Sequence, residues 1–475
     1  MATHDYVIAN GTGSAVRSDI NNVLAAIVST NSSSTEPSTK YAYQFWADTN
    51  SGYLKIRNAA NNGWVQLFKL DATLSDIPVE GTVVKSTGES GGTKFLREDG
   101  DGTCSWQTPE AGSSKNLIIN GSQLIAQRGT SSTSSGYQTI DRFPVYLAGL
   151  DESPTQAQVA VASGTTPYTL GFRKALKVTN GNQTSGANTG STQYIWVQHK
   201  IEAQDIANSG WNYLSASSYI TLSFWVRSSV AQTFKGYIET MDGTAYQYPF
   251  ETGSLSADTW TKITKSIPGN SNLTFDDNNG EGFKFSIVPF ISNNKTASSV
   301  TENAWSTYNS SARMKDSTTT WYTTNDATFE LTGVQLEVGS VASDFEHRSF
   351  AQELARCQRY FFAIPYGSSG NSSTMIQNLE SYAKSATEIQ SQATFPVPMR
   401  TNPSFTGSAT DCEFFAAANS ADFAVNGFAS YVAATGTNIT GMNLRKSSAS
   451  SMTAGQGGRI LFRENGGYMH FSAEL

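Results

Sequence analysis

Short strand-like segments separated by polar turns are the feature that most limits what this chain can fold into. Apolar and polar residues alternate repeatedly in the middle of the chain, for example over residues 194–201 and 220–227. Alternation places every second side chain on the same face of an extended strand. In residues 220–227 it puts Leu222, Phe224 and Val226 on one face. Repeated short strands of this kind predict an all-β sandwich.

The last of these strands is predicted at residues 329–339. Strict alternation divides it into two faces, with Phe329, Leu331, Gly333 and Gln335 on one and Thr332, Val334, Leu336 and Val338 on the other. We expect one of these faces to be uniformly apolar and to pack onto the core of the sandwich.

The composition agrees with a folded β protein of several domains. At 475 residues the chain is too long for one ordinary core. Charged residues make up only 15%, and the 25 Phe, 20 Tyr and 9 Trp supply enough apolar area to exclude a disordered chain. The net charge of −7 argues against general nucleic-acid binding.

The sequence shows neither a signal-peptide pattern at its start nor an apolar run long enough to cross a membrane. We therefore expect a protein made in a cytosol and not inserted in a membrane. The three cysteines, Cys104, Cys357 and Cys412, are isolated and odd in number. This pattern favours reduced thiols over disulfides.

Several sequence motifs, which follow one another in a fixed order along the chain, resemble those of a known group of proteins. They include YQFWADTNSGYLKIRNAANNGWVQLF near the N-terminus, NLIINGSQLIAQRGTS, YIWVQHKIEAQDI and ITLSFWVRSS in the middle, and GVQLEVGS followed by DFEHR and ELARCQRYF. These motifs resemble sequences found in tail fibre and tail-tip proteins of tailed bacteriophages, especially in fibres of the marine cyanophage-type podoviruses. The central blocks are also distantly similar to the carbohydrate-binding modules attached to glycosidases.

The resemblance implies a mainly β, multidomain chain that forms a homotrimer. Its implied parts are a small α+β adaptor at 1–70 that anchors to the virion, a shaft or linker at 71–112, a carbohydrate-binding-like jelly-roll domain at 113–349, and a C-terminal β-sandwich tip at 350–475. In the shaft, residues expected to be buried against symmetry mates are Val83, Phe95, Leu96 and Trp106.

Apolar residues at helical spacing predict an amphipathic helix in the adaptor. They are Val16, Ile20, Val23, Leu24 and Ile27. This stripe is expected to cover the sheet that follows, to pack against copies of itself around a threefold axis, or to pack against the virion. A short isolated helix is marginal in water, so something must cover it.

The function implied by the resemblance is a virion structural protein, a tail fibre or tail-tip adhesin assembled in the host cytoplasm. Its partners would be other copies of itself, other virion tail proteins, and a host surface polysaccharide or lipopolysaccharide. Two alternatives remain: a surface polysaccharide depolymerase, and a purely architectural capsid or neck decoration protein. No HExxH or phosphate-loop motif is present in the sequence, so we expect no enzyme.

Binding modules of this kind stack sugar rings on exposed aromatic side chains and fix the hydroxyls with polar groups. The candidate glycan-binding residues are Trp196, Trp225, Trp305, Trp321 and Tyr322. Core packing is the alternative for each of them, because most tryptophans on buried strands are core residues.

Two acidic stretches, at residues 98–102 and 276–281, contain oxygen ligands that suit a structural calcium ion. Asp-Asn-Gly sequences are also ordinary turn sequences, so we expect turns there, with no metal site and no cofactor. His199 and His347 stand alone in the sequence, and we expect them to form hydrogen bonds rather than to bind metal.

Overall fold

The computed structural model describes most of the chain. The described residues are 4–70, 95–98, 104–107, 115–184, 192–364, 374–407, 412–416, 421–424, 429–431, 439–447, 452–462 and 468–475. The chain divides into two compact units, Met1–Ala111 and Gly112–Leu475. The predicted shaft residue Val83, and the side chains of Phe95, Leu96 and Trp106, lie outside the described part of the chain.

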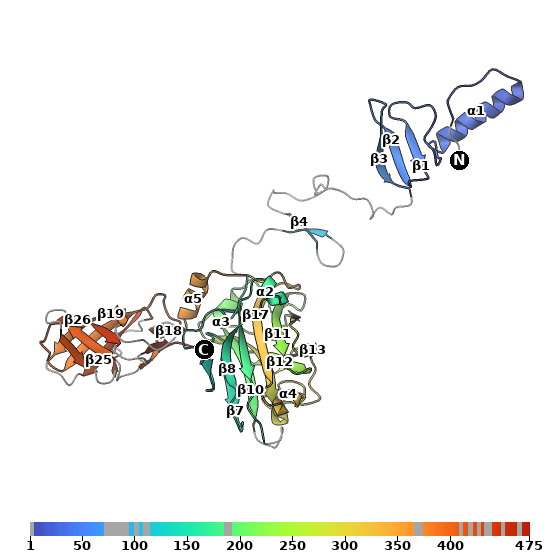
Figure 1. The fold of residues 1–475 in the computed structure, drawn as a ribbon. Coiled ribbons are helices and arrows are strands. Elements are labelled where there is room, and N and C mark those ends of the chain that lie inside the picture. Colours follow the sequence, from blue (N-terminus) through green and yellow to red (C-terminus); the bar gives the residue numbers. More distant parts are fainter. Residues whose placement is uncertain are drawn as a thin grey trace. The chain divides into compact units, whose positions relative to one another are not determined.

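The N-terminal unit combines one helix with a small sheet (Figure 1). Helix α1 (Gly13–Val28) begins after Thr12, whose hydroxyl accepts a hydrogen bond from the Ala15 N–H. An antiparallel three-stranded sheet follows, made of β1 (Phe45–Asp48), β2 (Tyr53–Arg57) and β3 (Trp64–Lys69). Farther along the chain, β4 (Phe95–Glu98) pairs with β5 (Cys104–Gln107).

The N-terminal unit has little core of its own. Among its described residues, the buried apolar side chains are Ala26, Trp46 and Ala47. The predicted α1 stripe instead faces outward, with exposed fractions of 43% for Ile20 and 57% for Ile27. A short helix is marginal in water unless its apolar face is covered, and the described residues of this unit leave that face largely exposed.

The central domain is a sandwich of two six-stranded sheets (Figure 1). One sheet has the strand order β16-β13-β12-β15-β10-β7, and the other has the order β14-β11-β17-β9-β8-β6. The strands are β6 (Ser131–Ser132), β7 (Val145–Ala148), β8 (Thr155–Ala160), β9 (Lys174–Thr179), β10 (Tyr194–Glu202), β11 (Tyr219–Ser228), β12 (Thr233–Thr240), β13 (Tyr246–Ser254), β14 (Thr261–Pro268), β15 (Glu281–Ile291), β16 (Ser306–Thr307) and β17 (Thr328–Val338).

The connections between these strands define a jelly roll. Strands β9, β17, β11 and β14 are neighbours in one sheet, and β10, β15, β12 and β13 are neighbours in the other. The chain therefore crosses between the sheets in the order of two Greek keys. The mainly β fold predicted from the sequence, with a β-sandwich at its centre, is confirmed.

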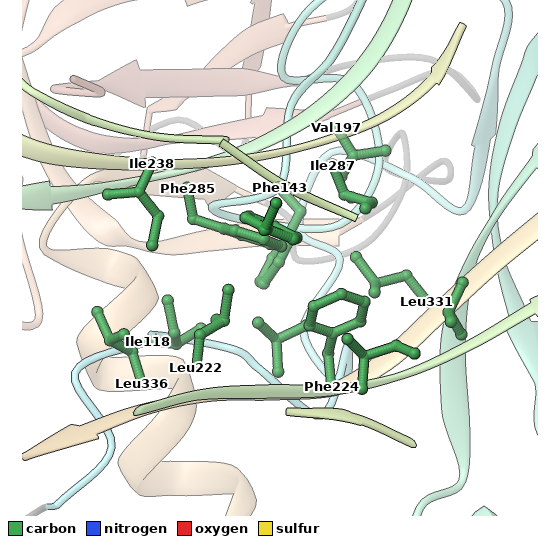
Figure 2. Packing of buried hydrophobic residues seen from close by; sticks show 14 of the residues in the cluster. Ile118, Phe143, Val197, Leu222, Phe224, Ile238, Phe285, Ile287, Leu331 and Leu336 are labelled. Atoms are coloured by element: carbon green, nitrogen blue, oxygen red, sulfur yellow. The ribbon is translucent and has the colours of Figure 1, made fainter. Parts of the chain in front are cut away.

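Apolar side chains from both sheets fill the space between them. Figure 2 shows Phe285 and Ile287 of β15 on one side of this space and Leu222 and Phe224 of β11 on the other. All four side chains are fully buried, as is Val226. The face predicted for residues 220–227 is confirmed. Burial of each such side chain contributes roughly 1.5–3 kcal/mol, so this cluster is the main source of stability of the sandwich.

Strand β17 departs from the predicted alternation at Gly333. Phe329 and Leu331 belong to the core before this residue, and Val334 and Leu336 belong to it afterwards. Figure 2 shows Leu331 and Leu336 in the same core. The register between β11 and β17 shifts here because β17 carries one extra residue, a β-bulge. The predicted strict alternation, with one uniformly apolar face, was therefore wrong.

The C-terminal part contains a helix and two further sheets. Helix α5 (Phe350–Gln358) starts with a capping box between Ser349 and Gln352. The sheets have the orders β18-β27-β21 and β23-β22-β26-β19-β20-β25-β24. Their strands are β18 (Phe361–Ile364), β19 (Thr374–Ser385), β20 (Glu388–Thr394), β21 (Ser404–Gly407), β22 (Cys412–Ala416), β23 (Ala421–Ala424), β24 (Ala429–Tyr431), β25 (Gly441–Ser447), β26 (Gly457–Phe462) and β27 (Met469–Ser472).

These two sheets share a second hydrophobic core, to which Leu379, Ile389, Ile460 and Phe471 contribute. This core is separate from that of the jelly roll. Across the described residues, none of the helices is both long and apolar enough to span a bilayer.

Buried ion pairs connect the C-terminal residues to the jelly roll. Arg142 is fully buried and pairs with Glu474, and the Nη2 atom of Arg128 lies 3.1 Å from the other carboxylate oxygen of Glu474. Burial also raises the pKa of the neighbouring Asp141 carboxyl to about 6. Removal of one partner would leave an uncompensated buried charge, so these contacts hold the C-terminal residues against the sandwich.

Candidate functional site

The structure does not bring the five predicted aromatic residues together. Trp321 and Tyr322 lie in the short helix α4 (Thr320–Thr323) and are fully buried. Trp321 donates its indole N–H to the Thr328 carbonyl at 3.0 Å, and Tyr322 stacks on Phe290 with 3.8 Å between ring centroids. Neither ring reaches the surface. Their assignment as sugar-stacking residues is therefore corrected, because both are core residues.

Trp305 and Trp196 are only partly buried, but packing occupies both rings. Trp305 donates its indole N–H to the Pro268 carbonyl at 2.6 Å. Trp196 stacks on Tyr194, with 4.2 Å between the centroids and 13° between the planes. The guanidinium carbon of Arg313 lies 4.9 Å from the Trp196 centroid. A sugar could stack on Trp196 only after these contacts were displaced.

Trp225 lines a cavity of about 260 Å³ on the outer face of the sheet that contains β11, β14 and β17. We call it the Trp225 cavity. Its lining residues are Leu170, Phe172, Ser223, Trp225, Lys262, Gly333, Ser343, Asp344, Phe345 and His347. The sheet, the turn after α2 (Thr166–Thr169) and the segment after β17 supply these residues. Trp225 is thus a predicted aromatic residue that lines a cavity.

Three aromatic rings form one wall of the Trp225 cavity. The centroid of Phe172 lies 4.8 Å from that of Phe345 and 5.1 Å from that of His347. The ring Nε2 of His347 donates a hydrogen bond to the Leu170 carbonyl at 2.8 Å. The hydrogen-bonding role predicted for His347 is confirmed. This bond joins the segment after β17 to the turn after α2 and closes that side of the cavity.

Gly333 allows the rings of Phe172 and Trp225 to approach the backbone of β17. Its φ of +62° lies in the left-handed region, where side chains other than glycine are strained. A Cβ atom at this position would lie 2.7 Å from Cζ of Phe172 and 3.1 Å from Cδ1 of Trp225. Both distances are too short for ordinary contacts. The bulge and the missing side chain together set the positions of the Phe172 and Trp225 rings.

Polar residues of β17 hold the segment that forms the aromatic wall. The Glu337 carboxylate accepts hydrogen bonds from the Ser343 N–H at 2.8 Å and from the Ser343 hydroxyl at 2.5 Å. Gln335 accepts one from the Glu346 N–H at 2.8 Å. Lys115 also donates to the Ser343 hydroxyl, at 2.6 Å. A wall held in this way loses little conformational freedom when a ligand binds.

Several polar groups of the Trp225 cavity have no partner within the described part of the chain. They are the Ser223 hydroxyl, the Trp225 indole N–H, the Lys262 ammonium group and the Asp344 carboxylate. Ser223 is only 4% exposed, so its hydroxyl has little access to bulk water. A ligand with both hydroxyl groups and an apolar face can supply the missing partners and pack on the rings.

The predicted acidic stretch at 276–281 forms a turn. The Asn278 side chain accepts a hydrogen bond from the Gly280 N–H at 2.7 Å and donates one to Asp276 at 3.2 Å. Among the described residues, no three His, Cys, Asp or Glu side chains are grouped closely enough to hold a metal ion. Of the other acidic stretch, residues 99–102 lie outside the described residues.

Two further titratable residues named from the sequence, His199 and Cys357, are buried. His199 accepts a hydrogen bond from the Ile119 N–H at 3.4 Å, which agrees with its predicted role. Its burial lowers the pKa of the ring well below the usual value. Cys357 is a free, buried cysteine, and burial raises the pKa of its thiol. Neither group takes part in the Trp225 cavity.

Trp225 was predicted from the sequence, but most of the other residues that line the cavity were not. Phe172 and Lys262 come from segments far from Trp225 in the sequence, so nothing in the pattern joined them. A signal was available for Phe345 and His347, since an aromatic and charged run directly follows the last strand of the sandwich. Ser223 lies two residues before Trp225 in β11, but nothing in the sequence indicated a role for it.

No protein-family model matches this chain, and no curated protein matches it. Similar solved structures include the enzymatically active domain of tailspike protein 4 of bacteriophage CBA120, with 10% identity and a TM-score of 0.26 over 47% of this chain and 21% of that one. The CBM22-1–GH10 modules of Clostridium thermocellum xylanase 10B have 10% identity and a TM-score of 0.22, over 48% of this chain and 30% of that one.

A third similar structure is the CBM22-1–CBM22-2 tandem domain of Paenibacillus barcinonensis Xyn10C. It has 10% identity and a TM-score of 0.23, and the match covers 78% of this chain and all of that one. The matches to the first two structures span less than a third of their length. Identities and TM-scores this low carry no argument about function, so the proposal below rests on the geometry of this chain.

Proposed function

We propose that this protein is a non-enzymatic virion adhesin, a tail fibre or tail-tip protein, whose central jelly roll binds a host surface glycan. The Trp225 cavity is the observation that carries the glycan part of the proposal. Its rings provide apolar surfaces for the faces of a sugar, and Ser223, Lys262 and Asp344 provide unpaired groups for its hydroxyls. The ligand is a host polysaccharide or lipopolysaccharide, bound without a cofactor.

The single acidic residue among those that line the Trp225 cavity favours binding over hydrolysis. Glycosidases that use a pair of carboxyl groups place them roughly 5–9.5 Å apart across the scissile bond. Asp344 is the one acidic residue among those that line the Trp225 cavity. We therefore propose that a bound glycan leaves the cavity uncleaved.

In this proposal the N-terminal unit attaches the protein to the virion and joins three chains into a trimer. Val16, Ile20, Val23 and Ile27 follow one another at spacings of four, three and four residues. These are the d and a positions of a heptad repeat, and β-branched residues at both positions favour three helices over two. A threefold coiled coil of α1 would cover the exposed Ile20 and Ile27 side chains.

Adsorption of the purified protein to host cells tests the glycan part. We expect Trp225→Ala to reduce binding to cells, or to their extracted surface polysaccharide, at least tenfold. Trp196→Ala is the matched control, since it removes a partly buried tryptophan from the outer face of the other sheet. Loss of binding in Trp196→Ala alone would move the site to that sheet. Appearance of new reducing ends in the polysaccharide would instead support the depolymerase alternative.

Labelling of intact particles tests the virion part. An antibody against residues 113–349 should decorate the tail, because the jelly roll is proposed to project from it. Decoration of the capsid or neck would favour the architectural alternative.

A further inference from the structure

We infer that the Trp225 cavity holds a single sugar ring, so that the protein binds its glycan by a terminal residue rather than along an internal stretch. This inference rests on the proposed glycan-binding function and adds the mode of binding. Three features of the cavity carry it: its size, its closed side, and the position of its unpaired polar groups.

The size of the cavity limits the ligand to about one ring. Ligand pockets for drug-sized molecules usually measure ~300–1,000 Å³. The Trp225 cavity, at about 260 Å³, lies just below that range. A disaccharide would have to leave one of its rings outside the aromatic wall. One sugar residue of a glycan therefore makes all the contacts with the aromatic rings and polar groups of the cavity.

The closed side of the cavity excludes a chain that passes through it. The His347–Leu170 hydrogen bond of 2.8 Å and the contact between Phe172 and Phe345 join two of the wall segments. An internal sugar residue is linked on both sides and needs two openings. A terminal residue needs only one, so it can enter with its free end toward His347.

The open side is marked by charged side chains. Lys262 and Asp344 are both exposed and have no partner in the described part of the chain, whereas Ser223 is buried and Trp225 is partly buried. His347 and Leu170 are exposed too, but they are hydrogen-bonded to each other and so leave no opening between them. A ring that enters past Lys262 and Asp344 meets the Trp225 ring and then the Ser223 hydroxyl. The hydroxyl groups of a terminal sugar can pair with Ser223 and the Trp225 indole N–H, while the glycosidic bond leaves through the mouth.

Fluorine NMR of the full-length protein labelled with 5-fluorotryptophan tests occupancy of the cavity by one ring. The Trp225 and Trp196 signals are assigned by their loss in Trp225→Phe and Trp196→Phe. The probes are methyl glycosides of hexoses, deoxyhexoses, N-acetylhexosamines and hexuronic acids. At least one of them should shift the Trp225 signal in a saturable way and leave the Trp196 signal in place.

The dependence of affinity on chain length tests end-on binding. With the sugar that responds, Kd per chain should change less than threefold from the methyl glycoside to a tetrasaccharide that ends in the same residue. His347→Ala opens the closed side, and this variant should gain affinity for the tetrasaccharide relative to the monosaccharide. Gly253→Ala, in strand β13 of the other sheet, is the control variant and should behave like the wild type.

The outcomes separate this inference from the proposed function. Host polysaccharide that binds through Trp225, with affinity rising tenfold or more between the monosaccharide and the tetrasaccharide, would overturn the end-on mode and leave glycan binding intact. The same holds if polysaccharide shifts the Trp225 signal and no methyl glycoside does. If neither polysaccharide nor glycoside shifts the Trp225 signal, both the inference and the proposed site are wrong.

Discussion

At the scale of single residues, Gly333 is the position where one methyl group should change both stability and binding. Gly333→Ala adds a Cβ 2.7 Å from Phe172 at a φ of +62°. We expect it to lower the free energy of unfolding by roughly 1–3 kcal/mol and to weaken glycan binding, because the Phe172 and Trp225 rings must move. Denaturant titration and the cell-binding assay measure the two effects.

Gly253→Ala is the matched control for this change. Its φ of +74° imposes the same backbone strain, but no atom lies within 4 Å of the added Cβ. It should therefore cost some stability and leave binding unchanged. Equal loss of binding in both variants would mean that Gly333 does not position the rings.

His470 should make stability depend on pH. Burial lowers the pKa of its ring to about 4 in the folded protein, below the value of about 6.5 expected when unfolded. The folded state thus favours the neutral ring, so its contribution is complete above pH 6.5 and is lost as the pH falls toward 4. With allowance for solvent screening, we expect a loss on the order of 1–2 kcal/mol over this range.

A comparison with His470→Gln isolates this contribution. The raised pKa of Asp141, about 6, acts in the opposite direction, but it is present in both proteins and cancels in the difference. Unfolding free energies at pH 4.5 and 7 should therefore differ less in His470→Gln than in the wild type. An identical pH dependence would show that His470 is not buried in its neutral form.

Sequence patterns correctly predicted which side chains share a face of a strand. They did not predict which of these faces border a cavity and which are covered by other segments. Leu222 and Phe224 were predicted together and lie together in the core. Trp225, on the opposite face, was not distinguished from the fully buried Trp321. The segment after β17 and the turn at Leu170 leave space beside the Trp225 ring, whereas Trp321 packs inside the core of the sandwich. Contacts between distant segments of this kind leave no periodic signal.

At the scale of elements, helix α1 should carry the association of chains. Ile20→Ser combined with Ile27→Ser removes two exposed heptad positions, so the proposed trimer should dissociate at concentrations where the wild type stays assembled. Sedimentation velocity measures the change. The control is Asn22→Ser, an exposed helix position outside the stripe. A wild-type protein that is already monomeric at micromolar concentration would remove the basis for this prediction.

Strands were predicted more accurately than their irregularities. The segments at 194–201 and 220–227 correspond to β10 and β11. The bulge in β17 was not predicted, because it depends on the register with β11 and on the space that Phe172 and Trp225 require. A glycine in a strand pattern is the one local sign of such a bulge. That sign was present at Gly333.

At the scale of the whole molecule, the unit Gly112–Leu475 should fold without the residues that precede it. It has its own cores in the jelly roll and in the C-terminal sheets, and the pairing of Arg142 with Glu474 holds these parts together. A chain that starts at residue 113 should be soluble, should unfold cooperatively and should bind host glycan with a lower avidity. Aggregation of this fragment on expression would show that the N-terminal unit is needed for folding.

The order of strands along the chain was enough to predict the sandwich, because an alternation that buries one face of each strand leaves two packed sheets as the stable arrangement. Trimer formation and virion attachment stay predictions. They depend on surfaces between chains, and the sequence of one chain indicates such a surface only through apolar side chains that its own fold leaves exposed, as at Ile20 and Ile27.

A crystal structure of the protein with a bound fragment of its host glycan tests the central claim most directly. The account predicts density for one terminal sugar ring against Trp225, with hydroxyl groups within hydrogen-bond distance of Ser223 and Trp225 Nε1, and with the rest of the glycan leaving past Lys262 and Asp344. A glycan bound on the Trp196 face of the other sheet, or bound with the Trp225 cavity empty, would contradict it.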